Sequence, residues 1–295
     1  MRRSLMILAL AGAAALGAAL VVTRPQRMDA TDLAGLSGDA ARGETVFLAA
    51  GCGSCHMAPG ARDDAQRVMT GGQKFASPFG TFLAPNISPS DQGIAGWTAT
   101  DLANALIKGT GRAGQHLYPA LPYGAYARMT AQDVTDLHAF LMTLPPDPTP
   151  SAPHDIGFPF NIRLALGGWK ALFLNDDWVI TGDLDPAETR GRYLAEALGH
   201  CGECHTPRNV LGGLDRSRWL AGGPDPSGTG TIPNITPAKL TWTEEDIAAY
   251  LETGFTPDYD SVGGHMAHVV SNFAQLQPED RRAVAAYLKR VPPVD

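Results

Sequence analysis

A duplicated cysteine motif constrains the fold of this 295-residue chain more than any other feature. The pattern Cys-x-x-Cys-His occurs from Cys52 to His56 and again from Cys201 to His205, and the two motifs contain all four cysteines. Around them, further segments recur in the same order and at a nearly constant offset. In pairs, the repeated segments are GETVFLAAGCGSCH and GRYLAEALGHCGECH, LAPNISP and TIPNITP, GWTATDLANALIKG and TWTEEDIAAYLETG, and TAQDVTDLHAFLMTLPP and QPEDRRAVAAYLKRVPP. This duplication predicts two homologous domains in tandem, over residues 38–146 and 187–295.

Each copy is predicted to be helical. Thr98 and Thr243 are N-cap candidates with an aspartate three residues later, and Gly109 and Gly254 stand where a C-terminal glycine would end these helices. The closing segment of each copy carries apolar residues at helical spacing. No alternation is long enough for a strand, so we predict an all-α fold. Each copy also contains few large apolar residues for its length. We therefore expect its core to include a bound group in addition to its own side chains.

Three chemistries use paired cysteines of this kind. Zinc would need two further ligands for each pair, which distant histidines could supply. A redox dithiol of the thioredoxin type lies in a βαβ context and lacks the adjacent histidine. In haem c attachment the two thiols, one helical turn apart, add to the porphyrin vinyl groups, and the next residue is a neutral imidazole that binds the iron. Two such motifs at the same place in a repeated helical chain favour haem.

The sequence therefore predicts two covalently bound haem c groups. The predicted attachment cysteines, followed by the proximal iron ligands, are Cys52, Cys55, Cys201, Cys204, His56 and His205. The carbonyls of Pro85 and Pro233 are placed to accept a hydrogen bond from the proximal imidazole N–H, which would fix the ring. Trp97 and Trp242 would either donate to haem propionates or pack in the core.

The sixth iron ligand decides what each iron can do. A methionine thioether raises the reduction potential of the iron and prevents small molecules from binding to it. An open sixth position allows small molecules to bind and react there. In the second copy Met266 is the only methionine after His205, and it is the predicted distal ligand. Its neighbours His265 and His268 are the alternatives.

The first copy lacks a methionine at the matching place. Alignment of the closing helices puts Leu121, or a neighbour, opposite Met266, and leucine cannot bind iron. Met129, just before a helix N-cap, is the predicted distal ligand of the first haem, with His116 as the alternative and an open or water-bound iron as the third possibility. Leu276 matches Met129 in the second copy, so a plain packing role for Met129 stays open.

Residues 1–27 are predicted to be a signal peptide or a membrane anchor. They begin with MRR and continue with SLMILALAGAAALGAALVV, an apolar run just long enough to cross a bilayer. Small residues within the run could form a cleavage site, and a buried helix of the folded body is the remaining possibility. Either of the first two exports the chain, so we expect a periplasmic body, anchored to the inner membrane by this segment.

Residues 147–186 are predicted to be a spacer. Their first part is proline-rich, which favours an extended and semi-rigid chain. Their second part is too apolar for a free linker, with Phe158, Phe160, Leu164, Trp169, Leu172 and Phe173. We expect a short helix packed in the seam between the domains or, alternatively, a docking surface for a partner subunit.

Several of these segments resemble one group of proteins. PFGTFLAPNISP, GWTATDLANAL, HLYPALPY, HDIGFPFNIRLALGGWKALFL and HCGECHTPRN are similar to the cytochrome c subunits of membrane-associated bacterial dehydrogenases for alcohol, gluconate and sorbitol. They also resemble the two-haem cytochromes that accompany molybdenum enzymes oxidising aldehydes or isoquinoline. The resemblance implies class I cytochrome c folds, a periplasmic location and electron transfer. The chain departs from the three-haem subunits by lacking a third motif, and it has Leu121 where many relatives have methionine.

Function is predicted from the haems rather than from an organic active site. No paired carboxylates, catalytic triad or nucleotide loop is evident in the sequence. We expect a two-haem carrier that takes electrons from a periplasmic dehydrogenase and passes them to quinone, a small cytochrome or an oxidase. The alternative is a redox enzyme, a peroxidase or sulfur-compound oxidase, that uses an open first haem. The net charge of −7 argues against nucleic acid as a partner and leaves room for docking on a basic protein face.

Overall fold

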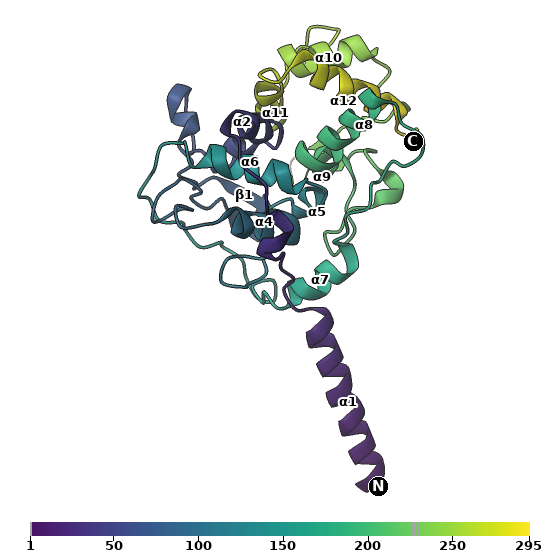
Figure 1. The fold of residues 1–295 in the computed structure, drawn as a ribbon. Coiled ribbons are helices and arrows are strands. Elements are labelled where there is room, and N and C mark those ends of the chain that lie inside the picture. Colours follow the sequence, from purple (N-terminus) through teal and green to yellow (C-terminus); the bar gives the residue numbers. More distant parts are fainter. Residues whose placement is uncertain (1, 226–227, 229) are drawn as a thin grey trace.

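Helices form most of the regular structure in the computed structural model, which describes residues 2–225, 228 and 230–295 (Figure 1). The helical elements of the first half are α1 (Arg2–Val22), η1 (Ala30–Leu33), α2 (Ala40–Ala49), α3 (Cys52–His56), η2 (Asp63–Arg67), α4 (Ala99–Lys108), α5 (Tyr123–Tyr126) and α6 (Ala131–Leu141). Those of the second half are α7 (Ala165–Phe173), α8 (Pro186–Arg192), η3 (Tyr193–Leu198), α9 (Cys201–His205), η4 (Arg216–Arg218), α10 (Glu244–Thr253), α11 (Met266–Phe273) and α12 (Pro278–Arg290).

The predicted helix caps are confirmed. The Thr98 hydroxyl accepts a hydrogen bond from the Asp101 amide at 3.1 Å, and the Asp101 carboxylate accepts one from the Thr98 amide at 3.0 Å. Thr243 caps α10 in the same reciprocal way. Both helices end at the predicted glycines, Gly109 and Gly254. Each pair of bonds satisfies amides that the first helical turn leaves without partners, so the repeated sequence pattern sets both boundaries.

The expectation that the chain contains no strands is wrong. Two antiparallel hairpins occur, β1 (Lys74–Ser77) with β2 (Gly80–Leu83) and β3 (Gly223–Pro224) with β4 (Thr231–Ile232). In the first hairpin Phe75 pairs with Phe82. Strands of two to four residues are too short to show the alternation that marks a strand in a sequence. The fold is mainly helical, as predicted, and the two short hairpins are small additions to it.

In each copy the first and last helices pack across one another, α2 on α6 and α8 on α12. A glycine lies at each crossing, Gly43 in α2 and Gly191 in α8. A Cβ atom at Gly43 would overlap the carbonyl of Asp136, and one at Gly191 would overlap the carbonyl of Ala283. The missing side chain lets the two helix backbones approach closely, which fixes where each Cys-x-x-Cys-His helix starts.

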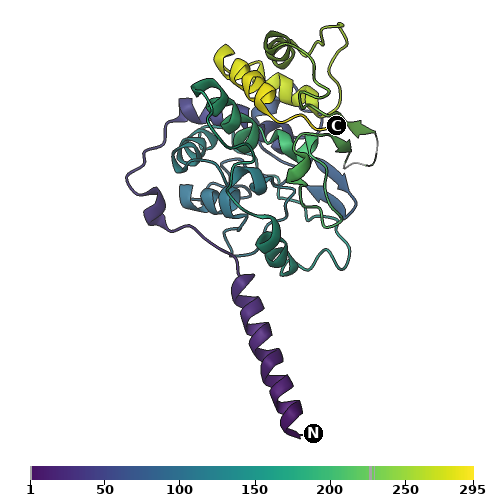
Figure 2. The same ribbon diagram turned by 90° about the vertical axis from the view of Figure 1, so that its right-hand side faces the viewer.

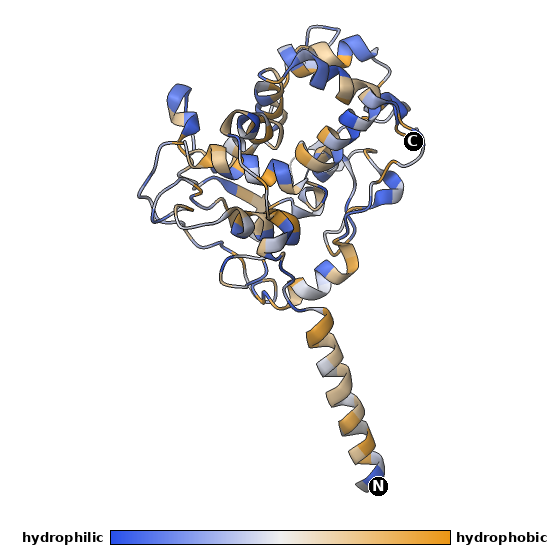
Figure 3. Cartoon of the chain, viewed as in Figure 1, coloured by the Kyte–Doolittle hydropathy of each residue, from blue (hydrophilic) through white to orange (hydrophobic). Residues whose placement is uncertain are grey.

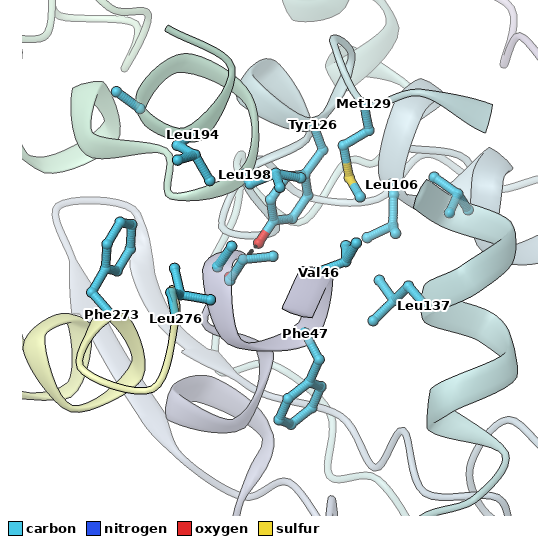
Figure 4. Packing of buried hydrophobic residues seen from close by; sticks show 14 of the residues in the cluster. Val46, Phe47, Leu106, Tyr126, Met129, Leu137, Leu194, Leu198, Phe273 and Leu276 are labelled. Carbon is cyan, nitrogen blue, oxygen red and sulfur yellow. Dashed lines mark hydrogen bonds between the residues drawn. The ribbon is translucent and has the colours of Figure 1, made fainter. Parts of the chain in front are cut away.

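One cluster of buried apolar side chains runs through both copies. Figure 4 shows Tyr126 of the first copy beside Leu194 and Leu198 of the second, with Phe273 and Leu276 in the same cluster. The copies therefore pack against one another, and Figure 2 shows the yellow C-terminal helices lying on the purple and teal body. The domain limits at 38–146 and 187–295 stay predictions.

The spacer is held along the first copy rather than swinging free. Thr81 of β2 and Asp155 exchange two backbone hydrogen bonds, at 2.8 and 2.9 Å, and the Leu83 amide donates to His154 Nδ1 at 3.1 Å. Helix α7 then touches both copies. The Lys170 ammonium donates to the Gly109 carbonyl in the first copy, and the Trp169 indole donates to the Leu211 carbonyl in the second. A short helix at the seam is thus present.

Helix α1 projects away from the body (Figure 1). Residues Arg3–Val22 are long and apolar enough to cross a membrane, and none of that span is buried within the protein. The possibility of a buried helix of the folded body is therefore wrong. A signal peptide and a membrane anchor both fit this geometry.

Candidate haem-binding sites

Each Cys-x-x-Cys-His motif forms a single helical turn, α3 in the first copy and α9 in the second. The residue before each turn, Gly51 or His200, is in the left-handed conformation, with φ of 63° and 42°. This reversal lets the helix before the motif end and a new turn begin at once. Each turn carries two cysteines, and none of the four forms a disulfide. Their spacing over one turn is what attachment to two vinyl groups of one porphyrin requires.

The thiols are in surroundings that suit covalent attachment rather than redox or zinc chemistry. Burial raises the pKa of Cys52 and of Cys201 to about 12, with the second cysteine of each motif adding to the rise. A redox dithiol or a metal thiolate needs a lowered pKa instead. Haem c uses two cysteines whose sulfurs add to the vinyl groups and a following histidine that binds the iron, and each motif supplies all three.

The proximal imidazoles are oriented as predicted. Nδ1 of His56 lies 2.8 Å from the Pro85 carbonyl, and Nδ1 of His205 lies 2.8 Å from the Pro233 carbonyl. Because a carbonyl only accepts, Nδ1 carries the proton and Nε2 is left free to bind iron. Burial lowers the pKa of both histidines, against the opposing effect of the carbonyl hydrogen bond, so both rings are neutral near pH 7.

A glycine behind each histidine brings the proline carbonyl into place. The amides of Gly71 and Gly222 donate to the carbonyls of His56 and His205, both at 2.7 Å. Both glycines have left-handed φ values, +78° and +73°. A Cβ at either would lie 2.6 Å from the backbone of the proline loop. Only glycine allows the two chain segments to run this close, which holds the hydrogen-bond acceptor at a fixed distance from the imidazole.

An asparagine that the sequence reasoning missed anchors each proline loop. Asn86 Nδ2 donates to the carbonyls of Asp147 and Thr149 at 2.9 and 2.8 Å, and Asn234 Nδ2 donates to the Val294 carbonyl at 2.7 Å. The repeated PNISP and PNITP segments were the available signal. Each asparagine ties the loop that orients the histidine to the chain following the last helix of its copy.

The candidate distal residues of the two copies lie in matching environments. Met266 is the first residue of α11 and is half-buried against the shared core, and Leu121 is half-buried against the same core. The alternative ligands His265 and His268 are both exposed. The assignment of Met266 as iron ligand stays a prediction.

Met129 and His116 lie in contrasting surroundings. Met129 is 5% exposed and packs in the cluster with Leu106 and Leu137, and its counterpart Leu276 is also 5% exposed (Figure 4). Equal burial of methionine and leucine at one position favours a packing role. His116 Nε2 faces the Thr23 carbonyl at 3.0 Å, at the base of α1. Neither contact favours iron ligation, and the sixth ligand of the first site stays a prediction.

The two tryptophans pack against the core. Trp97 is half-buried there, and its carbonyl accepts a hydrogen bond from His138 Nε2 at 2.9 Å. Trp242 is half-buried as well and stacks edge-on with Tyr250, with ring centroids 5.3 Å apart. These contacts support the packing interpretation, and the propionate role stays a prediction.

The second copy reaches its motif by a π-helical turn, η3. One more residue separates Gly191 from Cys201 than separates Gly43 from Cys52. The extra residue is absorbed where the Gly199 amide bonds the Leu194 carbonyl at 2.6 Å, the widened spacing of a π-helix. The turn buries Glu196 completely.

Glu196 is fully paired despite its burial. Its carboxylate accepts hydrogen bonds from the amides of Val179 and Ile180, at 2.6 and 3.0 Å, and from the Tyr287 hydroxyl at 2.8 Å. Arg128 of the first copy lies 4.0 Å away. This network could not be predicted from the sequence, because the residues that form it are far apart along the chain.

The two motifs meet across the seam between the copies. The Tyr126 hydroxyl donates to the Ala50 carbonyl beside the first motif at 2.9 Å, and its ring packs edge-on against His200 beside the second, with centroids 5.6 Å apart. Asn272 Nδ2 of α11 donates to the Ser54 hydroxyl inside the first motif at 2.9 Å. The two candidate sites are therefore neighbours joined by direct side-chain contacts.

Comparison with known proteins identifies the family. The sequence model of the cytochrome c family matches residues 40–145. A diheme c-type cytochrome of Cereibacter sphaeroides is 58% identical over 300 residues, which cover 100% of this chain and 100% of that protein. This chain belongs to the diheme c-type cytochromes. It carries two covalently bound haem c groups.

Dehydrogenase subunits are also similar to this diheme cytochrome. The fructose dehydrogenase cytochrome subunit of Gluconobacter japonicus is 38% identical over 270 residues, covering 85% of the chain and 52% of that subunit. The cytochrome c subunit of a quinone alcohol dehydrogenase from Gluconobacter oxydans is 36% identical over 268 residues, covering 86% of the chain and 55% of that subunit. The cytochrome thus spans about half the length of these two relatives. The resemblance inferred from the sequence motifs is confirmed.

Proposed function

We propose that this diheme cytochrome accepts electrons from a periplasmic dehydrogenase and delivers them toward the respiratory chain, to quinone, a small cytochrome or an oxidase. The observation that carries the proposal is the direct contact between the two haem-binding motifs through Tyr126, His200 and Asn272. When bound, each haem iron supplies a one-electron redox centre. A carrier with two such centres needs them close together and held at a fixed separation.

In this proposal the residues of the chain orient the two haems and set the reduction potentials of their irons. Four cysteines hold the haems, and we assign His56 and His205 as proximal ligands because their Nδ1 atoms are already engaged by Pro85 and Pro233. This hydrogen bond increases the basicity of the imidazole and so lowers the potential of the iron it binds. Met266 is proposed as the distal ligand of the second iron, and Met129, with His116 as the alternative, as that of the first. The shared apolar core limits the access of water to the seam.

The names of the relatives support a dehydrogenase as donor. Fructose and alcohol dehydrogenases each contain a cytochrome subunit of which this chain matches about half. The body would lie in the periplasm, with α1 as its anchor in the inner membrane. Two matching haem sites on a single rigid body would let a donor and an acceptor use different faces.

The test is respiration in membranes from a strain that lacks this chain. Oxygen uptake is measured with a panel of alcohols, aldehydes and sugar acids as substrates. We expect one substrate-driven activity to be lost, to return when the full chain is supplied, and to stay absent with the double variant Cys201→Ser/Cys204→Ser. Unchanged uptake with every substrate would contradict the proposal.

A second candidate function rests on Leu121. Because leucine stands where the second copy has Met266, the first haem would be open to small molecules, as in a peroxidase or sulfur-compound oxidase. Carbon monoxide added to the reduced protein separates the two functions. Prompt binding to one haem of the two favours the enzyme, whereas absence of binding to either leaves the carrier.

A further inference from the structure

The second part of the spacer, residues 156–174, turns its charges inward. Lys170 is only 9% exposed, and its ammonium donates to the carbonyls of Lys108 and Gly109 at 2.8 and 2.5 Å. Arg163 donates to the His116 carbonyl at 2.9 Å and lies over the Tyr118 ring, 4.5 Å from its centroid. These are the only two basic residues in that segment, and it contains no acidic residue. Both cationic groups of the segment therefore interact with the body of the protein.

The same segment turns its large apolar side chains outward. Phe158 is 80% exposed and Leu172 is 69% exposed. The neighbouring loop adds to this surface, because the Trp169 indole of α7 holds it by a 2.9 Å hydrogen bond to the Leu211 carbonyl. We call this surface the apolar patch, and it consists of Phe158, Phe160, Ile162, Leu164, Leu172, Val210 and Leu211. Soluble proteins rarely expose so many large apolar side chains in one place without a partner.

The apolar patch lies where α1 leaves the body. The Thr23 carbonyl, just after α1, packs against Gly167 of α7 so closely that a Cβ there would overlap it, and the same carbonyl accepts from His116 Nε2 at 3.0 Å. Arg27 then donates to the Arg112 carbonyl at 2.7 Å. Figures 1 and 2 both show α7 beside the exit of α1, and Figure 3 shows orange residues on both helices.

We propose that the apolar patch inserts into the interfacial layer of the bilayer that α1 crosses, as a second, monotopic membrane contact. The inference rests on the proposed anchoring by α1. A helix of membrane length ends at the level of the patch, so lipid reaches the patch as soon as α1 is inserted. Apolar side chains on a surface without outward charge bind lipid through burial of their area rather than through anionic headgroups. Asp155 and Asp176 flank the segment along the sequence, so the stretch without acidic residues is limited to the residues between them.

Photo-cross-linking to lipid tests the inference with the complete chain and both haems attached. The protein is reconstituted into phosphatidylcholine vesicles doped with a phosphatidylcholine whose acyl chain carries a diazirine near the glycerol. After floatation and irradiation, lipid adducts are located by mass spectrometry. We expect adducts on α1 and on residues 156–174, and none on the 256–264 loop, which lies beyond α10 at the opposite end of the body (Figure 1).

A matched pair of variants sharpens the result. Phe158→Glu/Leu172→Glu replaces two exposed side chains of the apolar patch, and Tyr259→Glu replaces an 86% exposed side chain in the control loop. The first variant is expected to lose the adducts on residues 156–174 while keeping those on α1, and the second to keep both. Adducts on α1 alone in the unmodified chain would overturn the inference and leave a protein partner as occupant of the patch. Failure of the chain to float with the vesicles would overturn the proposed anchoring by α1. It would leave the proposed electron transfer untouched, because that function is tested by the respiration experiment.

Discussion

Single residues set the chemistry of each iron, and the glycine behind each histidine illustrates how. Gly71 and Gly222 have no catalytic group, yet they decide how closely the proline carbonyl approaches the imidazole. The strength of that hydrogen bond tunes the basicity of the ligand. We therefore expect a backbone position to influence the reduction potential of the iron that the imidazole is predicted to bind.

Replacing Gly222 by alanine tests this control. The added Cβ would meet the backbone of residues 232–234 at 2.6 Å in a left-handed conformation, so the loop carrying the Pro233 carbonyl must shift away from His205. We expect the midpoint potential of one haem to rise and that of the other to stay unchanged in a spectroelectrochemical titration. Gly223→Ala is the control, because a Cβ there has ordinary contact distances of 3.4 Å and more. Equal potentials in Gly222→Ala and the unmodified protein would argue against the hydrogen bond as the tuning element.

Leu121 offers a complementary gain of function. Leu121 and Met266 are half-buried at matching places, so Leu121→Met would offer the first iron a thioether where leucine now stands. If the first haem of the reduced unmodified protein binds carbon monoxide, we expect this variant to lose that binding. Leu121→Ile, which keeps the volume without the sulfur, should bind as the unmodified protein does. Carbon monoxide binding that is the same in both variants would show that this position does not face the iron.

At this scale much of the site could be predicted from the sequence. The repeat places Pro85 and Pro233 at similar spacings, 29 and 28 residues after His56 and His205, and that alignment was enough to predict the imidazole hydrogen bonds. Asn86 and Asn234 were missed, although they are repeated too, because an asparagine within a proline-rich turn has many possible partners. Only the folded chain shows that these side chains reach the end of the copy.

The π-helical turn η3 is the main difference between the elements of the two copies. A single added residue before the second motif widens the helix, and Glu196 is buried at that point. A buried carboxylate is tolerated only where its oxygens are satisfied, and here two amides and a hydroxyl do so. The insertion and the buried acid therefore depend on each other.

Glu196→Ala is expected to be strongly destabilising. The variant leaves the buried Tyr287 hydroxyl and the partly buried amides of Val179 and Ile180 without their acceptor, and each fully buried loss costs about 1 to 3 kcal/mol. A clearly lower urea midpoint than in the unmodified protein is the expected result, followed by far-ultraviolet circular dichroism. Glu245→Ala, on the exposed face of α10, serves as the control and should leave the midpoint in place. A midpoint unchanged by Glu196→Ala would mean that water replaces the carboxylate at no cost.

Secondary structure was predictable where it has a local cause. Capping residues at Thr98 and Thr243 determine α4 and α10 without help from the rest of the fold. The short strands β3 and β4 depend instead on a pairing that brings Gly223 opposite Ile232, and nothing within two residues signals it. The π-turn was visible only as an alignment gap, because a one-residue insertion can equally be placed in a loop.

On the scale of the whole molecule, the seam joins the two copies into one body. Arg128 is a central residue of that seam. It donates to the Asp177 carbonyl of the spacer at 3.0 and 2.8 Å and to the Gly124 carbonyl of its own copy at 2.8 Å, and it faces Glu196 of the other. Composition and repeats predict two copies, but they do not predict that the copies share a core, because this depends on contacts between residues far apart in sequence.

Arg128→Ala should loosen this coupling. The truncation removes the guanidinium that faces Glu196 and two of the hydrogen bonds to the Asp177 carbonyl, which keeps only its bond from Arg216, inside a region shared by both copies. In the unmodified protein we expect the loss of helix content and the shift of the haem absorption bands to occur in a single urea transition, and in the variant to occur in two. Arg282→Ala, whose ion pair with Glu279 is exposed, should behave as the unmodified chain does. Two separate transitions already present in the unmodified protein would argue that the seam is only a loose contact.

The contacts of the Thr23 carbonyl with Gly167 and His116 affect how the protein would meet its partners. Because α7 and His116 hold the end of α1, the body cannot tilt freely about its tether. In the proposed arrangement, with α1 and the apolar patch both in the bilayer, the remaining motions would be rotation about the membrane normal and lateral drift. Encounters with a membrane-bound donor or acceptor would then occur by two-dimensional diffusion. The same edge of the molecule would stay at a constant distance from the membrane surface.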